Sequence, residues 1–210
     1  MTYSYGLLLV LVPALLVSMM MHELAHGFVA YRLGDPTAKL HGRLSFNPLR
    51  HLDPLGTAMF VITYLIPPHF IFGWAKPVPV SPYYFKSRQR GMAIVGIAGP
   101  LTNFILAVVF VLILNALHPS TDSLGFEALF LLFQGNLVLG LFILIPIPPL
   151  DGSRVVGAFL PRGAYEKWVE VDRYGMFIIL IFVFLFWSRF SFILNDVINA
   201  FINIFLTNYT

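Results

Sequence analysis

The sequence predicts an all-α integral membrane protein, a multi-pass bundle of about five (four to six) transmembrane helices with one re-entrant or membrane-dipping segment. Hydrophobic residues make up 58% of the 210 residues, and charged residues make up 11%, where soluble domains carry roughly 25%. A soluble chain of this size could not bury so much apolar surface in one core. We therefore expect one integral-membrane domain over residues 1–210, multi-pass in a cell membrane.

Several apolar runs approach or exceed the length of about 20 residues that a spanning helix needs. The first lacks a basic leader and a small-residue cleavage pattern, so we interpret it as a retained helix and not a signal peptide. The last carries Asn195, Asn199 and Asn203 at four-residue spacing, which is one polar stripe on a helix. That helix either spans with the stripe facing the protein or lies at the interface. In chain order the runs are 6–31, 92–117, 124–145, which ends at a proline-rich break, and 175–187 and 190–206, which Arg189 separates.

The run 55–72 differs from these, because Pro67 and Pro68 interrupt it and basic segments flank it on both sides. The positive-inside rule places the Lys- and Arg-bearing segments 32–53, 76–90 and 152–173 in the cytoplasm and 118–127 outside. A segment with cytoplasmic residues on both sides enters and leaves the membrane on one side. We therefore predict that 55–80 is re-entrant or membrane-associated, buried in protein or lining a wet cavity.

The chain contains no cysteine, which excludes disulfides, thiolate metal ligands and a cysteine nucleophile. Any zinc ion must therefore be held by histidine and carboxylate side chains. The net charge of +3 is modest, and the basic residues lie in short separate loops. This pattern suits membrane orientation and the lipid bilayer as a partner, and it argues against nucleic-acid binding.

The first apolar run contains His22-Glu23-Leu24-Ala25-His26, which is an H-E-x-x-H motif. On a helix the two histidines share a face one turn apart, so both imidazoles can reach one metal ion. Glu23 follows the first histidine and can act as general base toward a zinc-activated water. The motif also arises by chance in long proteins. Here, however, it lies in an otherwise uncharged apolar helix, where each charged residue near the bilayer centre costs about 3 kcal/mol.

A catalytic zinc usually has three protein ligands and one open position. The best candidate for the third is Asp151, which follows Pro146-Ile147-Pro148-Pro149-Leu150 at the end of an apolar run. Gly152 allows a sharp backbone turn directly after it. An Asp-Gly pair is more commonly an ordinary turn. Its place at a membrane-helix end, in a chain with an intramembrane H-E-x-x-H, favours the metal ligand.

The two motifs, MHELAHG from Met21 and P-x-P-P-L-D-G from Pro146, resemble the signatures of the site-2 protease family of intramembrane zinc metalloproteases. Three further segments resemble its compact bacterial and archaeal branch, which has no appended PDZ or CBS domain. They are GDPTA…GRLSFNP…HLDP over 34–54, GWAKPVPV over 73–80 and AGPLTN over 98–103. The similarity runs from about residue 18 to residue 160, with the motifs in the family's order.

The resemblance implies that His22, His26 and Asp151 bind one Zn²⁺ per chain and that Glu23 is the catalytic base. The implied reaction is hydrolysis of a peptide bond in or beside a transmembrane helix of a protein or peptide substrate. Such a reaction suits regulated intramembrane proteolysis, with an active site toward the cytoplasm. The resemblance also implies strand or loop structure, dipping into the membrane, over 55–80.

One position departs from the family pattern, which usually has Asn eight residues before the ligand Asp. Here that position is Ile143. The family's Asn is thought to hold substrate or the developing oxyanion, and loss of such a donor can cost on the order of a hundredfold in rate. The alternative function is therefore a catalytically weak or inactive relative that binds membrane helices. A metal transporter is a third interpretation, but the middle helices offer almost no acidic or histidine residues for an ion path.

Three further residues are candidates for supporting the metal site or positioning substrate. His51 and Asp53 could orient a ligand histidine, or they are a loop histidine and a helix N-cap. Asn103 follows the Gly99-Pro100 pair in an apolar run and could hydrogen-bond across the bundle. The sequence does not predict the oligomeric state.

Overall fold

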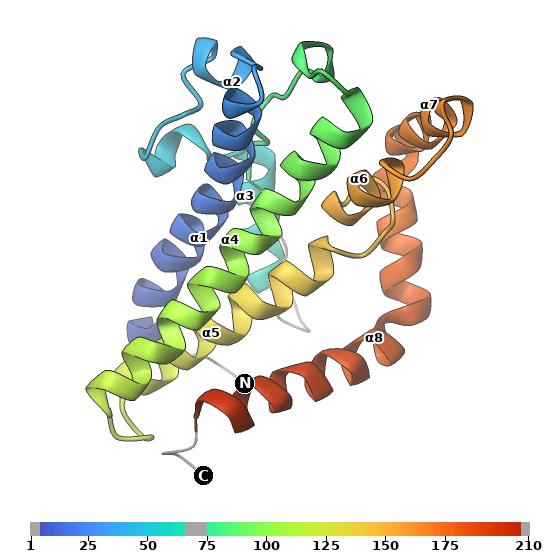
Figure 1. Cartoon of the computed structure of the whole chain (residues 1–210). Helices are drawn as coiled ribbons and strands as arrows, with labels where there is room; N and C mark the ends of the chain where they lie inside the picture. The colour runs from blue at the N-terminus through green and yellow to red at the C-terminus, as the bar shows by residue number, and fades with distance from the viewer. Residues whose placement is uncertain (1–4, 66–74, 207–210) are drawn as a thin grey trace.

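The computed structural model describes residues 5–65 and 75–206, and in these ranges the fold is an all-α membrane bundle, as predicted. Three long helices run side by side (Figure 1): α1 (Tyr5–Arg32), α4 (Arg88–Leu117) and α5 (Leu124–Ile143). Within the described ranges these three are long and apolar enough to span a membrane, and the number is four if the bent C-terminal helix counts as one span. Three spans fall just below the predicted range of four to six, and four lie at its lower end.

The ends of the spanning helices follow from local sequence. Ser123 precedes α5, and its hydroxyl oxygen accepts a hydrogen bond from the backbone N–H of Phe126 at 3.1 Å, which is a helix N-cap. Pro146 cannot continue the helix after Ile143. Large apolar side chains stay exposed on the long helices, Leu9 at 78% and Phe184 at 89% among them. An aqueous surface would not favour this exposure, whereas lipid does.

The packed core lies where α4, α5 and the end of α8 (Gly175–Phe205) meet. Its fully buried members include Leu114, Phe133 and Leu137. Helix α4 also packs against α1 and against the short helix α6 (Asp151–Gly157). Helix α4 is therefore the central element, and every helix that carries a predicted zinc ligand touches it.

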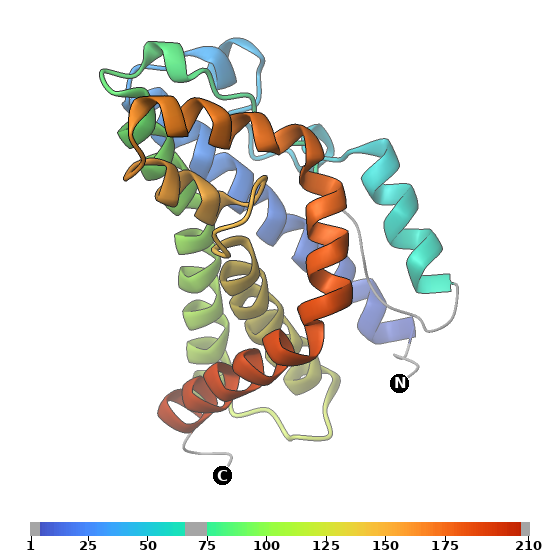
Figure 2. The same cartoon turned by 90° about the vertical axis from the view of Figure 1, so that its right-hand side faces the viewer.

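The two C-terminal runs, predicted as helices divided by Arg189, are continuous as one helix, α8, but that helix breaks into two segments close to the predicted division. Helix α8 bends by 77° between Phe186 and Ser188, and it crosses the end of the bundle (Figure 2). Leu194 and Ile198 are buried in the core while Asn195, Asn199 and Asn203 are exposed. The asparagine stripe thus faces away from the protein, which favours the interfacial alternative for 190–206.

The segments predicted to be cytoplasmic gather at one end of the molecule. Helix α2 (Thr37–Leu40), α6 and α7 (Arg162–Glu170) lie there, and the connection between α4 and α5 lies at the opposite end (Figure 1). The 3₁₀ turns Pro48–Arg50, Pro82–Tyr84 and Val171–Tyr174 complete the described elements. The positive-inside rule predicts this arrangement, with the Lys- and Arg-bearing segments at one end and residues 118–127 at the other.

The predicted re-entrant segment begins with a helix, α3 (Pro54–Leu65), so strand or loop structure at its start was a wrong expectation. Asp53 caps the start of the helix, because its carboxylate accepts a hydrogen bond from the N–H of Gly56 at 2.8 Å. No proline interrupts the residues that follow Pro54 until Pro67, so the helix can continue to Leu65. The interrupting prolines and the part of the GWAKPVPV motif before Ala75 lie outside the described residues. The chain returns beside its starting point, where Leu52 pairs with Ala75. Re-entry into a bilayer stays a prediction.

Candidate metal centre

Two imidazoles of α1 point into the interior of the bundle. His22 and His26 are one helical turn apart and are 6% and 8% exposed. Their Nε2 atoms lie 3.0 Å from each other. The spacing of the motif on a continuous helix produces this pairing.

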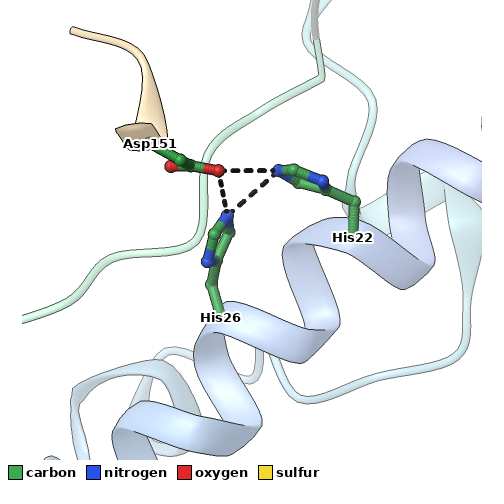
Figure 3. A group of neighbouring side chains, drawn as sticks. All are labelled: His22, His26 and Asp151. Atoms are coloured by element: carbon green, nitrogen blue, oxygen red, sulfur yellow. Dashed lines mark hydrogen bonds and ion pairs between the residues drawn. The ribbon is translucent and has the colours of Figure 1, made fainter. Parts of the chain in front are cut away.

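The third predicted ligand, Asp151, follows a tight turn between α5 and α6. Asp151 is the first residue of α6, and its Oδ2 lies 3.3 Å from His22 Nε2 and 3.0 Å from His26 Nε2 (Figure 3). A Cβ at position 152 would lie 2.0 Å from the carbonyl oxygen of Leu144. Only glycine therefore permits the turn that brings Asp151 to the histidines.

These three atoms fit a zinc ion. Ligands at about 2.0–2.1 Å in tetrahedral geometry are separated by roughly 3.3 Å, close to the 3.0–3.3 Å observed. Among the described residues Asp151 Oδ2 is buried and has no hydrogen-bond partner, a state that a cation relieves. Burial alone would raise the pKa of Asp151, but the two histidines hold it at about 2, so the carboxylate is charged. The group of His22, His26 and Asp151 could therefore bind a metal ion.

The outer nitrogens of the imidazoles are held by acceptors. His22 Nδ1 lies 2.6 Å from Asn103 Oδ1, and His26 Nδ1 lies 2.7 Å from the carbonyl oxygen of Val95. Both acceptors are oxygens, so each Nδ1 donates its proton to one of them, and Nε2 is the nitrogen of each ring that faces Asp151 and can bind a metal ion. This tautomer is the one that a metal ligand needs.

Asn103 belongs to a buried polar chain that crosses three helices. Its Nδ2 donates to Asn136 Oδ1 at 3.1 Å, and Asn136 Nδ2 donates to Ser18 Oγ at 3.1 Å. Asn103 and Asn136 are fully buried, and Ser18 is 2% exposed. The chain fixes the amide of Asn103 with its oxygen toward His22. Asn103 thus lies where the sequence placed it as a candidate, whereas the parts played by Asn136 and Ser18 were missed.

Replacing Asn103 by leucine is expected to lower zinc affinity by about 10–100-fold, because His22 loses the partner that sets its orientation and tautomer. The measurement is competition for zinc with a chromophoric chelator in detergent. Asn115→Leu is the matched control, since it makes the same change 12 residues along α4, about 18 Å from the site. Equal affinity of the Asn103 variant and the wild type would show that the hydrogen bond does not support the metal centre.

Glu23 follows the candidate ligand His22 in sequence, but its carboxylate contacts a different segment of the chain. Its Oε2 accepts a hydrogen bond from the backbone N–H of Val78 at 2.8 Å. That contact holds Oε2, and among the described residues no hydrogen bond engages Oε1. No sequence pattern identified Val78, because a backbone donor has no residue-type signature.

The segment 75–81 that carries Val78 is fastened at both ends. Lys76 N–H donates to the carbonyl of His51 at 2.8 Å, and the Lys76 carbonyl accepts from Arg43 Nη2 at 2.6 Å. Ser81 N–H donates to the fully buried Asp35 at 2.6 Å. The GDPTA and GRLSFNP motifs thus supply side chains that position the amide facing Glu23.

Neither His51 nor Asp53 is brought to the ligand histidines in the described structure. His51 is buried, and its Nε2 contacts the carbonyl of Ser45 at 2.8 Å. Asp53 caps α3. The structure therefore supports the loop and N-cap alternatives for these two residues, and a part in substrate positioning stays a prediction.

Gly99 is a site residue that the sequence marked only as part of a motif. A Cβ at this position would lie 2.4 Å from His22 Cε1 and 2.5 Å from the Nε2 atoms of both histidines. Helix α4 can approach the imidazoles only because position 99 has no side chain. The signal that could have indicated this close approach is a glycine within a helix, four positions before a polar residue on the same face.

Two imidazoles, a carboxylate and an adjacent glutamate inside an apolar bundle are typical of a membrane metalloprotease. Comparison with known proteins leads to the same class. A Bacillus subtilis (strain 168) protein with the name "Putative zinc metalloprotease YwhC" is 41% identical over 186 residues, which cover 85% of this chain and 82% of that protein. The chain therefore belongs to the zinc metalloprotease family that includes YwhC.

More distant relatives carry similar names. The Rip2 protein of Mycolicibacterium smegmatis (strain ATCC 700084 / mc(2)155) has the same description as YwhC and is 25% identical over 182 residues, 84% of this chain and 67% of its own length. Zinc metalloprotease MJ0392 of Methanocaldococcus jannaschii is 29% identical over 153 residues, 73% of this chain and 35% of its own length. No protein-family model matches the chain, and no solved structure matches it significantly.

Proposed function

We propose that this metalloprotease is an intramembrane endopeptidase of the site-2 type, acting on a transmembrane protein or peptide in regulated intramembrane proteolysis. One observation carries the proposal: His22, Glu23 and His26 lie within α1, inside the apolar stretch Leu9–Arg32 that is long enough to span a membrane. A base and metal ligands at that depth act on substrate within the bilayer. The basic loops at the α6 end favour an active site toward the cytoplasm.

In this proposal His22, His26 and Asp151 hold the zinc ion, which when bound polarises the scissile carbonyl and lowers the pKa of a water molecule. Glu23 Oε1 takes a proton from the attacking water and returns it to the leaving amine. Val78 holds Oε2 during both transfers. Asn103 and the Val95 carbonyl keep the imidazoles in place. A helical substrate must unwind locally, because its backbone carbonyls are otherwise engaged in hydrogen bonds.

The test uses the purified full chain, loaded with zinc in detergent or vesicles, and a panel of transmembrane peptides. Mass spectrometry of the products should place cuts within or beside the apolar segment. A zinc chelator should abolish cleavage, and added zinc should restore it. Cleavage only of soluble peptides of the same flanking sequence would contradict an intramembrane site while leaving the metalloprotease assignment intact.

The alternative, a weak or inactive relative that binds membrane helices, rests on Ile143. This residue ends α5, eight positions before Asp151, where the family's Asn would stand. We expect Ile143→Asn to raise the cleavage rate by up to about 100-fold, the value of one oxyanion donor. Ile145→Asn, two residues later, is the control for adding an amide near the same helix end. Stoichiometric zinc binding with no cleavage by either the wild type or Ile143→Asn would favour the helix-binding alternative.

A further inference from the structure

A groove lies along α1 and is lined by residues other than those of the metal centre. This groove has a volume of about 590 Å³, and Met21, Leu24 and Phe28 of α1 form its apolar wall together with Leu44. Tyr31 and Lys39 line its other end. None of the four residues His22, Glu23, His26 and Asp151 lines the groove. The lining of the groove therefore does not include the metal centre.

The length of the groove matches one leaflet of a bilayer. Its lining on α1 runs from Met21 to Tyr31, ten residues, which is about 15 Å of helix. The hydrocarbon core of a bilayer is about 30 Å thick, so 15 Å is half of it. An extended acyl chain lying along α1 would reach from the membrane interface to the level of the metal centre.

The volume favours a chain over a helix. A helix about 10 Å wide and 15 Å long occupies on the order of 1,200 Å³, about twice the volume of the groove. A second transmembrane helix could therefore cover the opening but not fill it. An acyl chain is narrow enough to enter.

Lys39 lines the polar end of the groove, and Arg32 lies against Phe28 of its wall. Lys39 Nζ donates to the Tyr31 hydroxyl at 3.0 Å, and the Arg32 guanidinium lies 4.9 Å from the ring centre of Phe28. Among the described residues no acidic side chain lines the groove. The nearby Asp35 is fully buried and bonded to Thr37 and Ser81. The mouth of the groove is thus positively charged.

The loop around this mouth carries large apolar side chains that are exposed. Leu40, Phe46 and Leu49 are more than 70% exposed. Apolar side chains beside Lys and Arg at a helix end are typical of a segment that lies in the membrane interface. Lipid headgroups then lie at the height of Lys39 and Arg32.

We propose that the groove is a specific site for one anionic glycerophospholipid. One acyl chain lies along α1 from Tyr31 to Met21, and the headgroup phosphate lies between Lys39 and Arg32. The site does not depend on the proposed function, because none of its residues belongs to the metal centre. Each basic residue near an anionic surface contributes roughly fivefold to binding, and the two together contribute roughly 30-fold.

Native mass spectrometry of the full chain tests the site, with the protein reconstituted in equal amounts of phosphatidylglycerol and phosphatidylcholine and then released from the membrane. The wild type should retain one phosphatidylglycerol molecule with a preference of at least tenfold. The variant Arg32→Gln with Lys39→Gln should lose that preference. Arg162→Gln with Lys167→Gln, which removes two charges from exposed positions on α7, is the matched control and should keep it.

A second measurement does not depend on charge. The chain contains no cysteine, so Ala25→Cys, in the wall of the groove, provides one reactive thiol. Phosphatidylglycerol should slow its modification by a maleimide at least fivefold, and phosphatidylcholine should not. Equal retention of both lipids, equal loss in the α7 control, or protection of the thiol by a transmembrane peptide in place of the lipid would each overturn the proposal.

Discussion

Replacing Glu23 by glutamine is expected to lower the rate of peptide hydrolysis by about 10²–10⁴-fold and to leave zinc binding unchanged. Glutamine has nearly the same shape as glutamate, and its amide oxygen can still accept the Val78 N–H that Glu23 accepts at 2.8 Å. It cannot take a proton from water. The substitution therefore removes the proton transfer and keeps the geometry.

Rates of peptide cleavage and zinc stoichiometry are measured on the same preparation of the Glu23 variant. Glu166→Gln, at an exposed position on α7, controls for loss of one negative charge and should match the wild type in both. A Glu23 variant that cuts at the normal rate would show that another group is the base. A variant that loses zinc as well would show that Glu23 supports the metal site.

Replacing Gly99 by alanine should lower zinc affinity at least about 100-fold, and activity should fall with it. The added methyl group would lie 2.4–2.5 Å from ring atoms of both His22 and His26, and carbon atoms normally approach each other to about 3.5–4.0 Å. The rings must shift by a large fraction of an ångström, or α1 and α4 must separate. A shift of that size removes two ligands from their common position, which exceeds the 10–100-fold effect of losing one supporting hydrogen bond.

Gly135→Ala provides the matched comparison, because position 135 is also a glycine within a spanning helix. A methyl group there would meet Leu15 Cδ2 at 3.4 Å, an ordinary contact. Zinc affinity is measured by chelator competition, and thermal unfolding of the zinc-free proteins reports on folding. If the Gly99 variant binds zinc as the wild type does, the two helices yield more readily than a packed interior should.

The spanning helices and the two candidate histidine ligands could be predicted from sequence for the same physical reason. Burying polar groups in a bilayer is costly, so long apolar runs and the few charged exceptions within them, such as Glu23, are both conspicuous. The division of the C-terminal apolar stretch near Arg189 could be predicted, but its form could not, because Arg189 between two apolar runs is compatible with a loop or with a bend in a continuous helix. Helix α3 was not predicted, because Pro67 and Pro68 interrupt the apolar run 55–72 as a whole, although the residues from Leu55 to Leu65 contain no proline.

The parts of the site that escaped prediction are those that depend on neighbours in space. Gly99 is important because a side chain there would collide with the rings of His22 and His26, and Val78 is important because its backbone N–H binds Glu23. Asn136 was visible as a polar residue in an apolar helix, but its link to His22 passes through Asn103. Sequence separations of 33 and 81 residues join these three side chains, and no local pattern encodes such distances.

The polar chain from His22 through Asn103 and Asn136 to Ser18 also restricts which substitutions can accumulate as related proteins diverge. Each amide donates and accepts a hydrogen bond while fully buried, so the loss of one member leaves the donor or acceptor of the next without a partner. Substitutions at 18, 103 and 136 should therefore appear together or not at all when lineages diverge. A relative in which position 136 became apolar while 18 and 103 did not would have had to admit a water molecule or a new side chain between its helices.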